Sequence, residues 1–131
     1  MSLRKDRIKQ ILRSMLGIMF VSAGILHFVE PEPFVRIVPS YLPEPLLLVW
    51  ISGFFEIVGG IGLFISRLRV WAAYGLIALL IAVFPANINM AVNNINFNGA
   101  IPNAALWLRL PLQLVLIACV WWSSISKERS P

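Results

Sequence analysis

The stretch that decides the fold runs from residue 45 to residue 65, PLLLVWISGFFEIVGGIGLFI. It has the apolar character and the length of a helix that crosses a bilayer, for which about 20 residues are needed. Glu56 lies close to its centre. A carboxylate at this depth is costly unless it is paired, neutralised or hydrated. The neighbouring helices must therefore give Glu56 a polar protein environment or water.

Small residues in the same stretch indicate that another helix packs closely against it. Gly53 and Gly60 share a helical face with Glu56, because residues three and four apart lie on one side of a helix. Glycines flatten such a face and let a second backbone approach. The preceding apolar run carries a packing stripe of its own, formed by Ser14, Gly17, Val21, Gly24 and Phe28.

Composition excludes a soluble globular domain. Of the 131 residues, 59% are hydrophobic and only 13% are charged, whereas soluble domains average about 25% charged. The net charge of +5 does not indicate a nucleic-acid partner, because the basic residues flank the apolar runs, where membrane topology explains them. The lipid bilayer is the expected partner.

Two single residues limit the chemistry. Cys119 is the only cysteine, which excludes an intrachain disulfide and a CxxC redox pair. His27 is the only histidine, which excludes an in-chain bis-His haem and argues against a His-based metal site. We therefore expect no haem and no metal.

The apolar runs predict an all-α fold, a four-helix transmembrane bundle that forms a single membrane domain over residues 1–131. The predicted spans are about 11–29, 45–65, 70–92 and 103–122.

The connections between the spans carry further predictions. The prolines of segment 30–43, EPEPFVRIVPSYLP, exclude a long helix, and its apolar side chains indicate a short interfacial or partly re-entrant segment over the outer mouth of the bundle. Pro85 is expected to kink the third span, and an asparagine-rich outer loop follows at 93–99. Asn103, after Pro102, is the expected N-cap of the fourth span.

Charge predicts the orientation. The basic arm at residues 1–13, the Arg67–Arg69 turn and the Lys127/Arg129 tail all fall on one side of a four-span chain, and that side should be cytoplasmic. Alternatively, the arm belongs to a signal peptide cleaved after Ala23. The apolar run continues past that point to Val29 without a polar region, which argues against cleavage.

Helical rise places five polar residues in one column. At roughly 1.5 Å per residue, Glu56 and Gln113 lie near the midplane, and Arg109 lies about one turn nearer the outside. His27 and Asn87 lie closer to the outer surface. We treat these five as candidate ligand-binding residues, with no catalytic residue assigned. We expect a direct or water-bridged pair between Glu56 and Arg109, which would let both charges persist in the membrane.

Each candidate also has a purely structural interpretation. A Glu56–Arg109 pair can serve only to fix the helix arrangement. His27 can be an interfacial histidine bonded to a loop carbonyl, and Asn87 a partner of a cap or kink. Gln113 can hold two helices together.

The residues also resemble a known family. Three stretches, GILHFVEPEPFVRIVPSYLP, SGFFEIVGGIGLFI and RLRVWAAYGLIALLIAVFPANINMA, resemble the DoxX-like family of small bacterial integral membrane proteins. The resemblance implies a four-helix bundle in the bacterial cytoplasmic membrane and a link to redox or quinone systems. It also implies that His27, Glu56, Asn87 and Arg109 are internal polar positions. The chain lacks the cysteine pair of some thiol-redox relatives.

These observations support one leading hypothesis and two alternatives. The leading one is an accessory membrane subunit of a redox or quinone-linked system, not an enzyme alone, whose outward-opening polar pocket holds a small ligand, with a quinone as the candidate. A protein partner or a homo-oligomer is expected. The first alternative is a non-catalytic scaffold or assembly chaperone. The second, a transporter component, is disfavoured because the chain shows no two-half architecture.

Overall fold

The computed structural model describes residues 2–95 and 99–126. Its helices are α1 (Ser2–Val29), α2 (Glu32–Ile37), α3 (Pro45–Phe64), α4 (Arg69–Val92) and α5 (Asn103–Ser124). Four of them, α1, α3, α4 and α5, are long and apolar enough to cross a membrane. The predictions of an all-α fold and of four helices able to span a bilayer are therefore confirmed. The prolines of the first connection restrict it to the single short helix α2, which follows α1.

Two helix starts differ from the sequence predictions. Helix α1 begins at Ser2 rather than near residue 11, because the basic arm is rich in good helix formers and contains neither Gly nor Pro. Asn103 is the first residue of α5 and not its cap. The cap is Pro102, whose carbonyl accepts the N–H groups of Ala105 and Leu106, so the N-cap prediction was wrong.

Helix α4 runs through Pro85 and ends at Val92. Asn87 and Asn89 therefore project from a helix and can be aimed at fixed neighbours. Of the predicted asparagine-rich loop, Asn96 and Asn98 lie outside the described residues, as do Lys127 and Arg129 of the basic tail.

Helices α1 and α3 form an antiparallel pair with direct backbone contact. A methyl group built on Gly24 would lie 2.6 Å from the carbonyl oxygen of Gly53, and one built on Gly60 would lie 2.9 Å from that of Gly17. Such positions admit only glycine without a shift of the backbone. The two predicted packing faces therefore meet each other.

Helices α4 and α5 form the second pair. Leu106 of α5 packs with Met90 and Ala91 of α4 in a small buried cluster near the loop that joins them. At the opposite end the two pairs meet in the main apolar core. That core consists of Leu16, Phe20, Leu63, Ala73, Leu76, Leu80 and Val120.

Polar contacts fasten the start of α1 to the end of α5. Lys9 is buried and donates from Nζ to Ser126 Oγ at 2.9 Å, and its ammonium lies over the Trp122 ring. Arg13 donates to the carbonyl oxygen of Ser123 at 2.7 Å. Cations suit the end of a helix, where the last carbonyls lack intrahelical donors.

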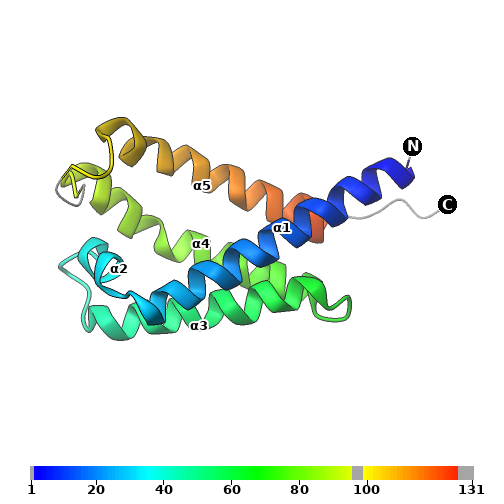
Figure 1. Cartoon of the computed structure of the whole chain (residues 1–131), viewed down its shortest axis with the longest axis horizontal. Helices are drawn as coiled ribbons and strands as arrows, with labels where there is room; N and C mark the ends of the chain where they lie inside the picture. Colours follow the sequence, from blue (N-terminus) through cyan, green and yellow to red (C-terminus); the bar gives the residue numbers. More distant parts are fainter. Residues whose placement is uncertain (1, 96–98, 127–131) are drawn as a thin grey trace.

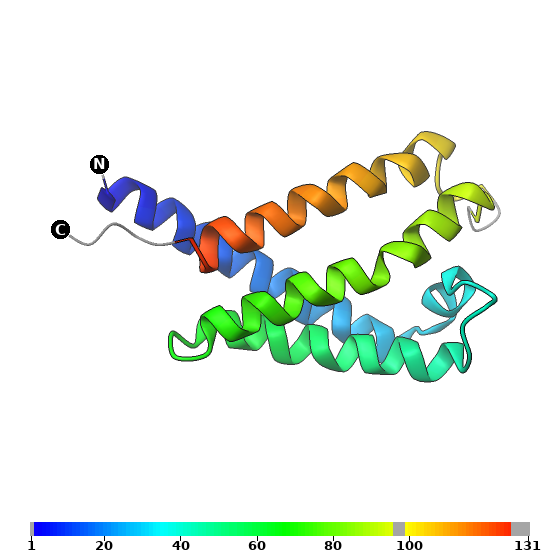
Figure 2. The same cartoon turned by 180° about the vertical axis from the view of Figure 1, so that it is seen from behind.

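Beyond the main core the two helix pairs diverge, and α2 lies between them at the far end (Figures 1 and 2). We call this the α2 end of the molecule. The start of α1, the end of α5 and the turn between α3 and α4 lie toward the opposite end. The divergence leaves room for a cavity between the pairs.

Candidate functional site

A cavity of about 640 Å³ lies between the two helix pairs. Its volume falls within the range of about 300–1,000 Å³ that is common for small-molecule sites. All five helices contribute to its wall, which is mainly apolar. The polar side chains on the wall include all five sequence candidates, His27, Glu56, Asn87, Arg109 and Gln113. The structure thus brings the candidates to one cavity, in two separate polar groups.

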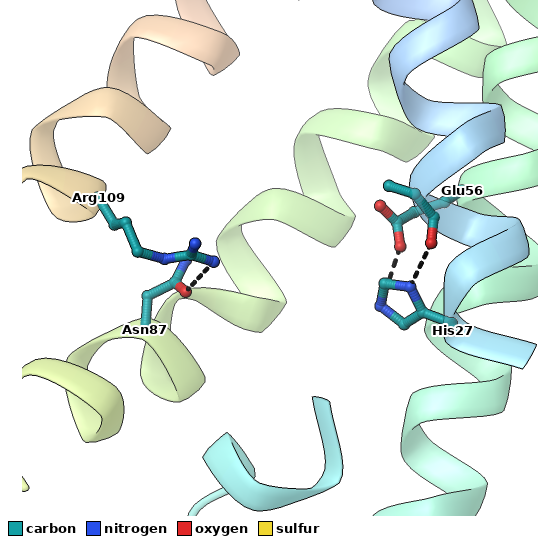
Figure 3. Close-up of polar contacts among 5 residues, drawn as sticks. His27, Glu56, Asn87 and Arg109 are labelled. Atoms are coloured by element: carbon teal, nitrogen blue, oxygen red, sulfur yellow. Dashed lines mark hydrogen bonds and ion pairs between the residues drawn. The ribbon is translucent and has the colours of Figure 1, made fainter. Parts of the chain in front are cut away.

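The first group joins the α1–α3 pair. His27 Nε2 lies 3.2 Å from Glu56 Oε2, and the ring's Nδ1 lies 2.7 Å from the carbonyl oxygen of Ala23, one turn earlier in α1 (Figure 3). Both side chains are mostly withdrawn from solvent. The expected environment for Glu56 is therefore supplied by a histidine of the adjacent helix.

This geometry defines where protons can reside. The Ala23 carbonyl can only accept a hydrogen bond, so His27 Nδ1 must carry a hydrogen and donate it. The contact between Nε2 and Glu56 Oε2 then holds one proton, either on nitrogen as an ion pair or on oxygen as a neutral pair. A pair of this kind can accept or release a proton at the cavity wall.

Helix α2 covers the histidine. The rings of His27 and Phe34 stack with centroids 3.9 Å apart and an interplanar angle of 19°. The other side of α2 is held by Asn89 of α4, whose Nδ2 donates to the carbonyl oxygen of Ile37 at 2.9 Å. One short helix therefore connects the two diverging pairs at the α2 end.

The second polar group joins the α4–α5 pair. Gln113 is buried and donates from Nε2 to the carbonyl oxygen of Leu80, and its Oε1 accepts from Asn87 Nδ2. The Oδ1 of Asn87 accepts from Arg109 Nη2 at 3.3 Å (Figure 3). The Leu80 carbonyl can only accept, so the Gln113 amide must point its nitrogen toward it and its oxygen toward Asn87. Asn87 must then turn its nitrogen toward Gln113 and its oxygen toward Arg109. The series of bonds ends at the guanidinium.

The expected direct pair between Glu56 and Arg109 is not formed. Glu56 pairs with His27, and Arg109 bonds Asn87, on opposite helix pairs (Figure 3). Depth along each helix correctly placed both on one cavity, but depth does not give the rotation of a helix about its axis. The Gly24–Gly53 contact sets that rotation and brings His27 beside α3, where a methyl group on Gly53 would lie 2.6 Å from His27 Cβ.

Two structural interpretations are also decided by the geometry. The carbonyl bonded to His27 belongs to its own helix, so the loop-carbonyl interpretation was wrong. Gln113 does hold α4 and α5 together, and it lines the cavity as well. Asn87 lies in the body of α4, where it bonds side chains of α5.

Sequence reasoning missed three residues of the site. Ser52 lines the cavity one turn before Glu56, and the three-and-four spacing on α3 could have identified it. Phe34, which lines the cavity and stacks on His27, and Asn89, which holds α2 in place, were not among the candidates. The aromatic ring within a proline-rich connection gave a weak signal for Phe34, and nothing in the sequence indicated the partner of Asn89.

Neither metal binding nor dithiol chemistry is indicated within residues 2–95 and 99–126. No group of three or more His, Cys, Asp or Glu side chains there is arranged to hold a metal ion. Cys119 is partly buried against the main apolar core, as expected for a small packing residue.

The fold and the site define a small protein with four helices able to span a membrane and a polar-lined cavity between them. Residues 16–124 match the family described as "Domain of unknown function (DUF8561)", and the chain belongs to this family. Neither the curated proteins nor the solved structures gave a match.

Proposed function

We propose that this protein is an accessory membrane subunit of a redox or quinone-linked system, and that its cavity binds the headgroup of a quinone or a related small ligand. The observation that carries the proposal is the convergence of His27, Glu56, Asn87, Arg109 and Gln113, from four helices, on one mainly apolar cavity. The resemblance of the helix motifs to DoxX-like proteins supports the link to quinones.

The two polar groups suit different parts of such a ligand. The guanidinium of Arg109 can donate to a carbonyl oxygen and stabilise negative charge that develops on it. The His27–Glu56 pair can exchange a proton. Reduction of a quinone to a quinol takes two electrons and two protons. A chain with a single cysteine has no dithiol to supply the electrons, so we assign their delivery to a partner protein.

Quinone binding to the purified protein tests the proposal, with the variants Glu56→Gln and Glu44→Gln. Glu56→Gln removes the exchangeable proton and weakens the contact with His27, so quinone affinity should fall by about tenfold, the equivalent of one charged hydrogen bond. Glu44 is exposed and does not line the cavity, so Glu44→Gln should bind as the wild type does. Unchanged binding by Glu56→Gln would remove the site assignment.

A scaffold or assembly chaperone is the second candidate. It is favoured by the completeness of the internal hydrogen bonding, since no buried side-chain nitrogen or oxygen within the described ranges lacks a partner. On this alternative, a stable partner protein would be recovered equally with wild type and Glu56→Gln, and no quinone would bind either.

For the orientation, we propose that both termini face the cytoplasm of a bacterial cell. The basic arm of α1 and the Arg67–Arg69 turn lie toward the same end of the molecule, and basic ends stay on the cytoplasmic side.

Cysteine labelling tests this orientation. In a Cys119→Ala background, Ser40→Cys lies at the α2 end and Ser66→Cys in the basic turn, and both positions are exposed. A membrane-impermeant thiol reagent added to intact cells should label Ser40→Cys and spare Ser66→Cys. The reverse pattern would contradict the orientation.

A further inference from the structure

Several side chains that line the cavity also have a large exposed fraction. A lining side chain with a large exposed fraction marks a place where the cavity is open. In a chain with four spanning helices, the surroundings at mid-depth are acyl chains. The depth of these side chains therefore indicates whether the cavity is reached from water or from the acyl chains of the bilayer.

The first gap lies between α1 and α5. Met19 of α1 and Leu112 of α5 both line the cavity and are 39% and 54% exposed. Each lies about three turns from the α2 end of its helix, well inside the apolar part. The side-chain contacts that fasten α1 to α5 lie at the other end, at Lys9 and Arg13. The two helices diverge from there (Figures 1 and 2).

The second gap lies between α3 and α4. Ile51 of α3 lines the cavity and is 43% exposed, and Ala82 of α4 is a small, exposed lining residue. Close contact between these helices is made farther along, where a methyl group on Gly59 would meet Leu76 and one on Gly62 would meet Ala72. The α3–α4 wall thus opens toward the α2 end, as the α1–α5 wall does.

The α2 end itself is partly covered by apolar side chains, one of which, Leu42, is 37% exposed. Phe34 and Ile37 of α2, followed by Val38, Pro39 and Leu42, line the cavity there. Helix α2 is held on both sides by the His27 stack and the Asn89 bond. A water-soluble molecule approaching from this end meets a partial, mainly apolar cover, whereas a molecule dissolved in the bilayer meets the α1–α5 and α3–α4 openings at the depth of the acyl chains.

The polar groups indicate the headgroup that such a molecule carries. Within the described residues, no carboxylate lies within ion-pair distance of Arg109, whose hydrogen bond goes to the neutral amide of Asn87. A full positive charge at the edge of an apolar cavity favours a ligand oxygen with negative or partial negative charge.

We infer that the cavity is loaded from within the membrane, through the α1–α5 and α3–α4 gaps, by an amphipath whose headgroup presents an acceptor oxygen to Arg109. Its apolar chain extends through a gap into the acyl region. This inference rests on the proposal that the cavity binds a ligand, and it names the class. Isoprenoid quinones and single-chain lipids with a carboxylate or phosphate head share this chemistry.

The test measures binding to the full chain in lipid nanodiscs, with three substitutions that plug the gaps and three matched controls. The plugs are Met19→Trp, Leu112→Trp and Ile51→Trp. The controls are Met15→Trp, Leu114→Trp and Ile61→Trp, at exposed positions of the same residue type and the same helices that do not line the cavity.

The probes are a benzoquinone headgroup with a ten-carbon chain, the same headgroup without the chain, and a sixteen-carbon fatty acid. We expect the chain-free headgroup to bind at least about tenfold more weakly than the chained one, because it buries less apolar surface. Plugging substitutions should slow association of the chained quinone or the fatty acid relative to their controls. Amphipaths extracted from the washed protein should be depleted in the plugged variants.

The outcomes separate this inference from the proposed function. If chained and chain-free quinones bind alike, or if plugged variants match their controls, loading from the membrane is overturned while quinone binding stands. If only the fatty acid binds and the plugs slow it, loading from the membrane holds and the quinone assignment fails. If the wild type retains no amphipath of any kind, both are overturned.

Discussion

At the residue scale, one buried amide determines the polar arrangement of the α4–α5 pair. The carbonyl of Leu80 orients Gln113, Gln113 orients Asn87, and Asn87 presents its oxygen to Arg109. Each step follows from the fixed donor and acceptor ends of an amide. A guanidinium carries more donors than the one that bonds Asn87, and Arg109 lies on the cavity wall, as the proposed contact with a ligand oxygen requires.

A double-mutant cycle tests this arrangement. Asn87→Ala and Gln113→Ala should each lower stability in detergent, since each leaves a polar partner unsatisfied. Their effects should be coupled by about 0.5–2 kcal/mol, the range found for hydrogen bonds between spanning helices. Asn103→Ala, at an exposed asparagine at the start of α5, should add independently to Gln113→Ala. Additive effects of Asn87→Ala and Gln113→Ala would contradict the assigned bond.

The pairing of Glu56 shows why residue-level prediction succeeded only in part. The sequence predicted that a carboxylate near the centre of an apolar helix needs a polar partner, and it placed His27 and Arg109 on the same column. The sequence could not give the rotation of each helix about its axis. The prediction therefore paired Glu56 with Arg109, whereas the structure pairs it with His27. A signal for His27 did exist. Side chains lean toward the N-terminus of their own helix, so in an antiparallel pair that meets at Gly24 and Gly53, His27 and Glu56 lean toward each other.

At the scale of elements, the α1–α3 pair forms the more tightly packed side of the cavity. Its glycines bring two backbones together and, with them, the histidine and the glutamate. A bulkier residue in this contact should separate the helices and lengthen the His27–Glu56 distance. Helix packing and the polar site are therefore coupled.

Substitution of glycines measures this coupling. Gly24→Ala places a methyl group against the Gly53 backbone and should destabilise the protein by about 1–3 kcal/mol, as overpacking does. Gly75→Ala meets nothing within 4 Å and should be neutral or slightly stabilising, because alanine favours the helix. Thermal unfolding in detergent measures the stability of both variants. Equal melting temperatures for the two variants would show that the backbone contact does not bear on stability.

Most helix boundaries were predictable because length and hydropathy leave few choices for a spanning segment. The predicted third span begins at Val70 and the observed helix α4 at Arg69, and both end at Val92. The start of the first helix was harder to predict. The charged residues of the arm indicated an anchor outside the helix, but their helix propensity lets α1 begin at Ser2. The segment that contains α2 was predicted to lie over the mouth of the bundle. The contacts that hold α2 there could not be predicted, because they depend on Phe34 and Asn89 meeting residues distant in sequence.

At the scale of the whole molecule, two helix pairs meet in an apolar core at one end and diverge toward the other, where α2 connects them. This shape produces a cavity that α2 partly covers at one end and that has exposed lining residues farther along, on α1, α3, α4 and α5. It also places the His27–Glu56 pair and the Arg109 guanidinium on separate walls. The shape thus favours an amphipathic ligand that lies between the two helix pairs.

Native mass spectrometry of the purified protein tests that claim most directly, with one substitution that fills the cavity and one that does not. Ala86 lines the cavity, whereas Ala78, on the same helix, is exposed and does not. The wild type and Ala78→Phe should both retain a bound amphipath, identified by its mass, and Ala86→Phe should lose it. Retention of the same mass by Ala86→Phe, or a wild type that carries no bound molecule, would contradict the account.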